Sequence, residues 1–377
     1  MKQHPAVGLP DAPSTITGTR NAATDHIRIV LTALVIFHHV AIVYGGSGGW
    51  YWREQPNASN KALLMFNAIN QAYFMGFFFL LAGYYTPSSF ERKGARRFMG
   101  ERFLRLGVPL VVYFFVLAPF TVALARTSEG FAFWPGWWEM TKSGIFGPGP
   151  LWFAEALLLF AGVYTIWRML RPAPNVKPEL PSFVSLALTA IILGGTSFLV
   201  RLAMPVGKEF AWMQLGYFPC YVYLFAAGCI SSRSQLLERI TFRQARPWIV
   251  VSLLAILTLP VVIFLHLGQG AFEGGFSSHA IYYALWDPLV ACGVILGILW
   301  AARTYWSKAA PLTTWLARNA YGAYIVHPPI VVGVSLVAAT WMLNPLVKFV
   351  AVGTAASIGS FFTAAVLRSI PGARQVL

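Results

Sequence analysis

Charged residues are scarce in this sequence. Only 11% of its 377 residues are charged, just 13 residues are Asp or Glu, and 57% are hydrophobic. Because soluble globular domains carry roughly 25% charged residues, this composition excludes an ordinary water-soluble protein. A mean hydropathy of +0.61 indicates a protein that lies in a lipid bilayer.

Cysteine is nearly absent as well. Cys220, Cys229 and Cys292 all fall in apolar stretches and form no Cys-x-x-Cys pair, so we predict no disulfide framework and assign them no role. The histidines have no Cys or carboxylate at a metal-ligand spacing in the same helix. The sequence therefore predicts no metal site, and no permanently bound cofactor is expected.

Two further features are missing: an internal repeat and a cleavable signal peptide. The lack of a repeat argues against transporter folds built from duplicated halves. Residues 1–24 carry Pro, Ser, Thr and charges without a short apolar core. We expect a disordered cytosolic tail over 1–24, followed by a first helix that stays in the membrane.

What the sequence does contain is a series of apolar stretches, each long enough to cross a bilayer as a helix. They predict an all-α, polytopic transmembrane bundle of about ten helices, with one domain over 25–370 and a short cytosolic tail over 371–377. The expected spans are 27–45, 62–85, 106–126, 149–169, 182–202, 211–231, 247–267, 280–302, 315–339 and 346–367.

The net charge of +15 comes from Lys and Arg residues in short loops between the apolar stretches. Since they form no continuous stripe, we expect no nucleic-acid partner. Most fall on one side of the predicted membrane, which the positive-inside rule makes cytosolic. Both termini should be cytosolic, in the cell inner membrane. The outer side then holds only Arg53, Lys61, Arg126, Lys142, Arg201, Lys208 and Lys348.

The first predicted helix contains an unusual set of ionisable residues. Arg28 and His39 are eleven positions apart, which is three helical turns plus roughly 20°, so they share one face about 16 Å apart in rise. Asp25 and Thr32 fall on the same stripe, while His38 faces about 80° away, toward a neighbouring helix. Ionisable groups at membrane depth are costly and indicate a functional site.

A second basic pair, Arg102 and Arg105, is placed three residues apart at the cytosolic end of the third span. The planar guanidinium forms directed, charge-assisted hydrogen bonds to phosphate oxygens, so the two side chains could clamp a phosphate. Alternatively, they only follow the positive-inside rule.

Taken together, these motifs resemble the acyltransferase-3 family of integral membrane acyltransferases. Arg28 and His39 match its Arg-x10-His signature, and 101–110 (ERFLRLGVPL) matches its Arg-x-x-Arg entry to the third helix. The segment 74–85 (FMGFFFLLAGYY) is similar to the second helix, and the passage from there into the third helix is most similar to the glucan-modifying succinyltransferases. Later segments, GPLWFAEALLLF and NAYGAYIVHPPIV, extend the resemblance over most of the chain.

The resemblance implies transfer of an acyl group, acetyl or succinyl in type, from cytosolic acyl-coenzyme A to a hydroxyl of a carbohydrate or other envelope acceptor. Arg28, Arg102 and Arg105 would bind the donor. His39 would act as general base or as transient acyl carrier. The alternative for His39 is a structural hydrogen bond within the bundle.

Other polar residues are expected at membrane depth. Glu155 and Asp287 lie near the outer surface, where each could orient an acceptor hydroxyl, polarise a histidine or form a structural hydrogen bond. Asn70, His38, Asp25 and His327 could line the site.

His327 precedes Pro328 and Pro329, a prolyl pair that should break the helix and form a site wall. A kink satisfied by neighbouring helices is the other reading.

Aromatic residues are concentrated in the outer segments 45–61 and 127–148. They either form interfacial belts or stack on sugar rings. These residues are Trp50, Tyr51, Trp52, Trp134, Trp137 and Trp138.

A different class of function also fits the buried polar residues. A proton-coupled transporter or exporter of a small molecule or lipid-linked glycan would use His, Asp and Glu as a proton relay. The sequence leaves the acyl group, the acceptor and the oligomeric state open.

Overall fold

The computed structural model describes residues 21–144, 147–172, 178–265, 268 and 270–377. Within these ranges the chain forms helices and no strand. Nine helical units in the described part are long and apolar enough to cross a membrane, which confirms the predicted polytopic helical bundle. They are Ala22–Val43, Lys61–Glu129, Gly149–Leu170, Phe183–Ala203, Leu215–Ser232, Phe242–Ile263, Ser278–Tyr305, Pro311–Ala338 and Pro345–Ser369.

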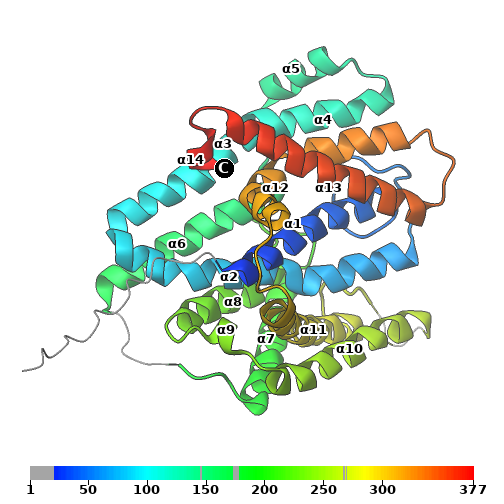
Figure 1. The fold of residues 1–377 in the computed structure, drawn as a ribbon. Coiled ribbons are helices and arrows are strands. Elements are labelled where there is room, and N and C mark those ends of the chain that lie inside the picture. The colour runs from blue at the N-terminus through cyan, green and yellow to red at the C-terminus, as the bar shows by residue number, and fades with distance from the viewer. Residues whose placement is uncertain (1–20, 145–146, 173–177, 266–267, 269) are drawn as a thin grey trace, which may run out of the picture.

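The longest unit, Lys61–Glu129, contains two of the ten predicted spans. Gly94 has a φ of 73° and a ψ of 165°, a conformation that only glycine adopts readily. Beyond it the chain turns back across the bundle (Figure 1). The unit comprises α2 (Lys61–Arg102), the π-helical η1 (Phe103–Gly107), α3 (Val108–Val112), the π-helical η2 (Tyr113–Leu117), α4 (Ala118–Arg126) and the 3₁₀ turn η3 (Thr127–Glu129).

The remaining elements complete an antiparallel series in which each spanning helix reverses the direction of the one before. They are α1 (Ala22–Val43), α5 (Phe133–Ser143), η4 (Gly149–Leu151), α6 (Trp152–Leu170), α7 (Phe183–Ala203), η5 (Leu215–Tyr217), α8 (Phe218–Ser232), α9 (Leu236–Arg239), α10 (Phe242–Phe264), α11 (Ser278–Tyr305), α12 (Pro311–Ala338), α13 (Pro345–Ser369) and α14 (Ala373–Val376).

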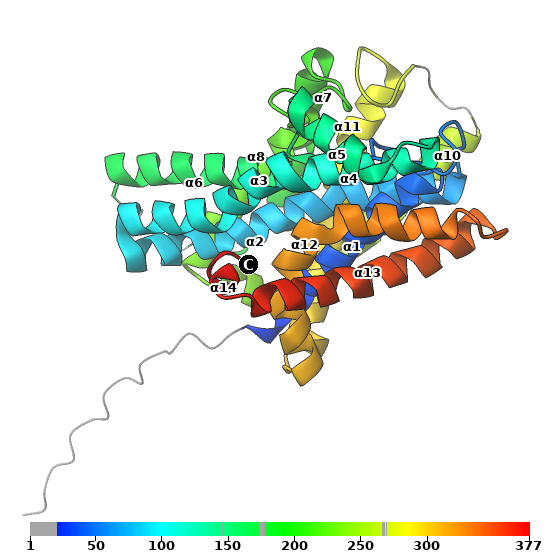
Figure 2. The same cartoon turned by 90° about the horizontal axis from the view of Figure 1, so that it is seen from above.

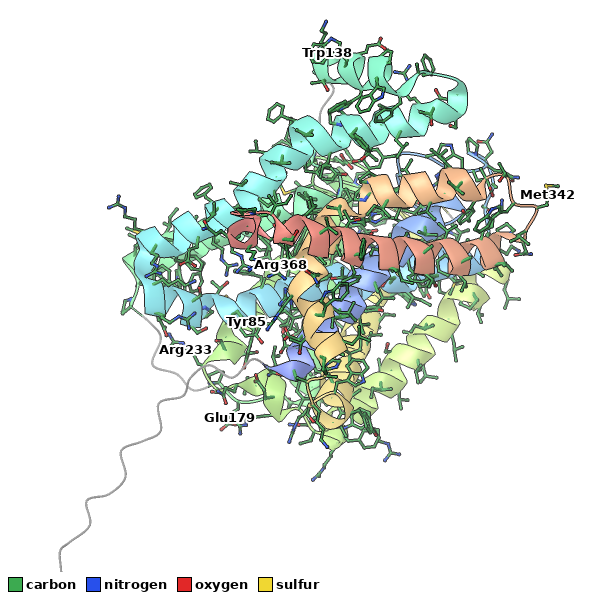
Figure 3. All side chains as sticks on the ribbon, turned by 45° about the horizontal axis from the view of Figure 1, so that its top comes forward. Tyr85, Trp138, Glu179, Arg233, Met342 and Arg368 are labelled. Atoms are coloured by element: carbon green, nitrogen blue, oxygen red, sulfur yellow. The ribbon has the colours of Figure 1, made fainter. Side chains whose placement is uncertain are left out.

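The two ends of the bundle differ in charge. We call the end with Arg102, Arg233 and Arg368 the basic side, and the end with the loops 44–60 and 204–214 the mouth side. Figure 3 labels Arg233 and Arg368 on the basic side and Met342 at the opposite end of α13. Residue 21 and the C-terminal residue both belong to the basic side.

The helices that will carry the site are the most buried ones. In the apolar windows of α1 and α12, 56% and 61% of the residues are buried, against 17% in α7 and α10. Figures 1 and 2 show α1 in the middle of the bundle, between α2, α12 and α13. α7 and α10 lie at the periphery, where their exposed apolar side chains suit contact with lipid.

Small residues allow α2 and α8 to approach closely. A Cβ at Gly83 would lie 2.1 Å from the carbonyl oxygen of Phe225, and one at Gly228 would lie 2.2 Å from that of Leu80. Close backbone contact through glycine is a common way for membrane helices to associate. The contact holds α2 against α8 below the site.

Some predicted boundaries need correction. The span expected over 211–231 begins instead at Leu215, because Ala211 and Trp212 have positive φ values of 48° and 58°. α1 begins at Ala22, three residues inside the predicted tail, where the Asn21 side chain accepts a hydrogen bond from the Thr24 backbone N–H. The rest of the predicted tail, residues 1–20, lies outside the described residues.

The expected helix break at the prolyl pair is wrong. α12 runs without interruption from Pro311 to Ala338, through Pro328 and Pro329. A proline removes one backbone hydrogen bond rather than the whole ladder, and a neighbouring group can satisfy the freed carbonyl. The side chain of His327 does so here.

Candidate functional site

His39 lies near the mouth end of α1, in a stack of three aromatic rings drawn from separate parts of the chain. Its ring centroid is 4.0 Å from that of Trp50 and 5.0 Å from that of His327, with interplanar angles of 21° and 23°. Trp50 belongs to the loop 44–60 and His327 to α12. The stack therefore joins the first helix, the first mouth-side loop and a helix far along the sequence.

A hydrogen bond connects the two stacked histidines. Nε2 of His327 lies 3.1 Å from Nδ1 of His39, and Nδ1 of His327 lies 2.6 Å from the carbonyl oxygen of Tyr324. Since a carbonyl can only accept, Nδ1 of His327 carries the hydrogen. In the neutral ring Nε2 is then an acceptor, so Nδ1–H of His39 donates to it. The unprotonated nitrogen of His39 is therefore Nε2.

His38 has a different environment, and it faces α2 as the helical register predicts. It is 8% exposed and its ring stacks on Phe74 with a centroid distance of 5.0 Å. The Asn70 amide donates to the Leu34 carbonyl (3.2 Å) and lies 3.4 Å from Nδ1 of His38, while Asn67 donates to the His38 carbonyl (3.0 Å). These bonds fix the mouth half of α1 on α2.

A cavity of about 1200 Å³ opens from His39 toward the mouth side, more than the roughly 300–1,000 Å³ of a typical small-ligand site. Its charged lining residues besides histidine are Lys61, Glu209 and Glu273, and Gln71 and Gln214 add amides. Aromatic side chains form much of the wall: Trp50, Tyr51, Phe74, Trp152, Trp212, Tyr217, Tyr221, Phe272, Tyr283 and Tyr324.

The loop 44–60, which we call the strap, holds Trp50 over His39. Arg53 donates to the carbonyl oxygens of Gly46 and Gly48 at 3.2 and 2.6 Å. Glu54 pairs with Lys348 of α13 at 2.5 Å, where the Lys348 side chain is 5% exposed. A hydrogen-bonded, buried ion pair fixes the strap to the last spanning helix.

Tyr51 of the strap also reaches across the cavity wall. Its hydroxyl lies 2.8 Å from that of Tyr113. Burial raises the pKa of Tyr51 to about 12, against the opposing effect of the Tyr113 hydrogen bond. The phenol is therefore neutral at physiological pH and can donate a hydrogen bond.

The outer aromatic residues divide into two groups. Trp50 and Tyr51 line the cavity, which fits the sugar-stacking alternative. Trp134 and Trp138 of α5 are 67% and 61% exposed, and Figure 3 shows Trp138 on the outer edge of the bundle. That position suits an interfacial belt.

The three arginines predicted to bind the donor lie toward the basic side and outside the cavity lining. Arg28 pairs with Asp25 at 3.6 Å. Arg102, half-buried at the end of α2, lies 3.5 Å from the Thr86 hydroxyl and over the Phe98 ring at 5.1 Å. Arg105 is exposed in η1. The π-helical η1 separates Arg102 from Arg105, so the two do not share one regular α-helical face.

Neither predicted carboxylate meets His39. Asp287 accepts a hydrogen bond from Arg201 at 2.5 Å, and both side chains are at most 5% exposed. Arg201, counted as an outer loop charge from sequence, lies in the last turn of α7 between the rings of Tyr217 and Tyr283, at 5.1 Å from each. Glu155 is half-buried in the first turn of α6, outside the cavity lining.

Of the residues expected to line the site, only His38 borders the cavity. Asn70 and His327 stand behind it, in contact with His38 and His39, and Asp25 lies one end of the helix away. Sequence reasoning missed the roles of Trp50, Arg201 and Lys348. Within the described ranges no three His, Cys, Asp or Glu side chains gather in a way that could hold a metal ion.

Comparison with known proteins identifies the family. The sequence profile described as an acyltransferase domain, of the acyltransferase-3 type, matches residues 21–367. Glucans biosynthesis protein C from Salmonella schwarzengrund and from Salmonella enteritidis PT4 are each 24% identical to this chain over 196 residues. Each match covers 48% of this chain and 48% of the relative, about half its length. No solved structure matches this chain.

Proposed function

This chain belongs to the acyltransferase-3 family, and on that premise we propose that it is a membrane O-acyltransferase. It moves an acyl group of acetyl or succinyl type from acyl-coenzyme A to a hydroxyl group of a carbohydrate acceptor. One observation carries this proposal: His39 borders a large aromatic cavity while its Nδ1 is already engaged by His327. Its Nε2 is left as a base at the cavity end.

The proton inventory fits general base catalysis. As the acceptor oxygen attacks the thioester carbonyl, its hydroxyl proton passes to Nε2 of His39, and the resulting imidazolium keeps its Nδ1–H bond to His327. The carbon–sulfur bond then breaks. The coenzyme A thiolate takes the proton from Nε2, which returns His39 to its starting state.

The cavity lining supports a carbohydrate acceptor. Aromatic faces with a few amide and hydroxyl groups suit sugar rings, which have apolar faces and polar edges. The charged groups at the mouth are two carboxylates, Glu209 and Glu273, and one ammonium, Lys61. This balance favours an uncharged acceptor over one with phosphate groups. The relatives' name, glucans biosynthesis protein C, makes a glucan the first acceptor to test.

The donor would approach from the other end. Coenzyme A carries phosphates, which the mouth carboxylates disfavour and which Arg28, Arg102 and Arg105 on the basic side suit. By the positive-inside rule that side is cytosolic, where acyl-coenzyme A is found. Along α1 the thioester would have to cover the rise of about 16 Å between Arg28 and His39. The enzyme would act in the cell inner membrane with both termini cytosolic.

Inside-out membrane vesicles offer a direct test. Radiolabelled acetyl- or succinyl-coenzyme A is added outside, where the basic side would face, and the label is measured in a neutral glucan enclosed in the vesicles. We expect incorporation with wild type and none with His39→Ala of equal expression and equal elution from a sizing column. Incorporation that is equal in the two proteins would remove His39 from the chemistry. Proton-coupled export of the glucan without acylation would favour a transporter.

A further inference from the structure

The position of Pro328 within α12 has a consequence for the chemistry of His39. In a regular α-helix the N–H of residue 328 would donate to the carbonyl of residue 324. Pro328 has no N–H, so the Tyr324 carbonyl loses its normal partner. The Tyr324 carbonyl instead lies 2.6 Å from Nδ1 of His327. The proline thus opens one acceptor for the side chain beside it.

We propose that Pro328 and His327 act together as positioning residues that select the basic nitrogen of His39. Pro328 frees the Tyr324 carbonyl, and this carbonyl holds the hydrogen of His327 on Nδ1. Nε2 of His327 must then accept from Nδ1 of His39 at 3.1 Å. This inference rests on the proposed function only in that Nε2 of His39 is the base.

Burial makes the selection rigid. His327 is fully buried, at 0% exposure, and water cannot supply a competing partner to either of its nitrogens. Trp50 is parallel to both rings, at 4.0 Å from His39 and 5.9 Å from His327, and closes one face of the pair. The titratable group that bonds to His39 is an imidazole, and the carboxylate of Asp287 is committed to Arg201.

The arrangement corresponds to the orienting role that an acid plays in a Ser-His-Asp triad, since the partner fixes the tautomer of the base. A neutral imidazole does this without placing a full negative charge in the membrane, where a lone carboxylate would be costly. The acceptor hydroxyl proton then has one destination, Nε2 of His39.

Three substitutions test the role of His327 and Pro328. His327→Phe keeps an aromatic ring but removes the acceptor, and we expect kcat to fall by about 100-fold or more. His327→Gln places an amide oxygen near the former Nε2 and should recover most of that loss. Pro328→Ala restores a competing N–H for the Tyr324 carbonyl and should lower kcat roughly 3- to 10-fold, the value of one hydrogen bond.

The neighbouring proline supplies a matched control. Pro329→Ala makes the same chemical change one residue later, where the restored N–H would bond to the Ile325 carbonyl and not to that of Tyr324. We expect it to leave kcat near wild type. Equal losses for Pro328→Ala and Pro329→Ala, or equal activity of the Phe and Gln variants at 327, would overturn the proposal.

A spectroscopic measurement separates this inference from the proposed reaction. In protein labelled with ¹⁵N at its seven histidines, the His39 signals are identified by their loss in His39→Gln. We expect the hydrogen on Nδ1 in wild type and in Pro329→Ala, and a shift toward the Nε2–H tautomer in His327→Phe. Nε2–H in wild type would refute the inference whether or not acyl transfer is observed.

Discussion

The imidazoles of His39 and His327 share a hydrogen bond of 3.1 Å although 288 positions separate them in the sequence. One histidine lines the cavity and the other is fully buried behind it. Their different exposure divides the work, because only His39 can meet a substrate.

Replacing His39 should abolish transfer while replacing His38 should not. We expect His39→Gln to lower kcat by about 10²- to 10⁴-fold, the usual contribution of a general base. His38→Phe keeps the stack on Phe74 and should cost less than about tenfold, through lost bonds to Asn70. Initial rates at saturating donor measure both. A larger loss in the His38 variant would exchange the two roles.

Releasing the strap should weaken both the fold and the site. Lys348→Met leaves Glu54 without its partner, and we expect a loss of about 2 kcal/mol in unfolding free energy. This is less than the 3–5 kcal/mol of a fully buried pair, because the Glu54 side chain is 19% exposed. Thermal unfolding in detergent measures it. The Lys348→Met/Glu54→Gln double variant should regain stability, and an unchanged midpoint in the single variant would contradict the assignment.

Removing the arginines of the basic side should reduce affinity for the donor. We expect Arg102→Ala/Arg105→Ala to weaken acyl-coenzyme A binding by about 10- to 100-fold, since each charge-assisted bond contributes roughly 1.5–3 kcal/mol before solvent exposure reduces it. Arg92→Ala/Arg96→Ala removes two exposed arginines of the same segment and serves as control. Binding as tight as wild type in the first double variant would exclude Arg102 and Arg105 from the donor site.

Breaking the buried pair in the cavity wall should distinguish structure from catalysis. Arg201→Met leaves the Asp287 carboxylate buried and unpaired, which costs about 3–5 kcal/mol. If Asp287 serves only to pair with Arg201, the Arg201→Met/Asp287→Leu double variant should regain stability and transfer together. Recovery of the unfolding midpoint without recovery of transfer would restore Asp287 to the chemistry.

The charge of the mouth should decide between acceptors. We expect a neutral glucan to be acylated with a lower KM than the same glucan carrying phosphate groups. Glu209→Gln/Glu273→Gln should reduce this preference by roughly 10-fold, because two like-charge repulsions are removed. Raised ionic strength should act in the same direction. A preference that ignores both changes would place the charge selection elsewhere.

The membrane fold was predictable because a helix in lipid must be apolar over about 20 residues, and few other signals are needed. The same argument located Arg28 and His39 on one stripe and predicted that His38 faces another helix. The start of the span near 211 was not predictable in this way. Hydropathy does not register the backbone conformation of Ala211 and Trp212.

The partners of the site were largely beyond the sequence. The contact of His39 with His327 and that of Glu54 with Lys348 join positions hundreds of residues apart, which periodicity cannot relate. The carboxylates Glu155 and Asp287 were reasonable candidates by depth, yet Arg201 was misplaced in a loop, so its pairing with Asp287 was hidden. One local signal was available: a histidine just before Pro328 can bond to the carbonyl that the proline frees.

The strap and the histidine pair also set an order of events during biosynthesis. Ribosomes add about 5–20 residues per second, so the 288 positions between His39 and His327 take on the order of 15 to 60 s to synthesise. During that interval the nascent chain carries His39 and Trp50 without His327, and Lys348 emerges later still. The catalytic end is thus completed only when the later helices arrive, which protects the cell's acyl-coenzyme A from hydrolysis by a half-made enzyme.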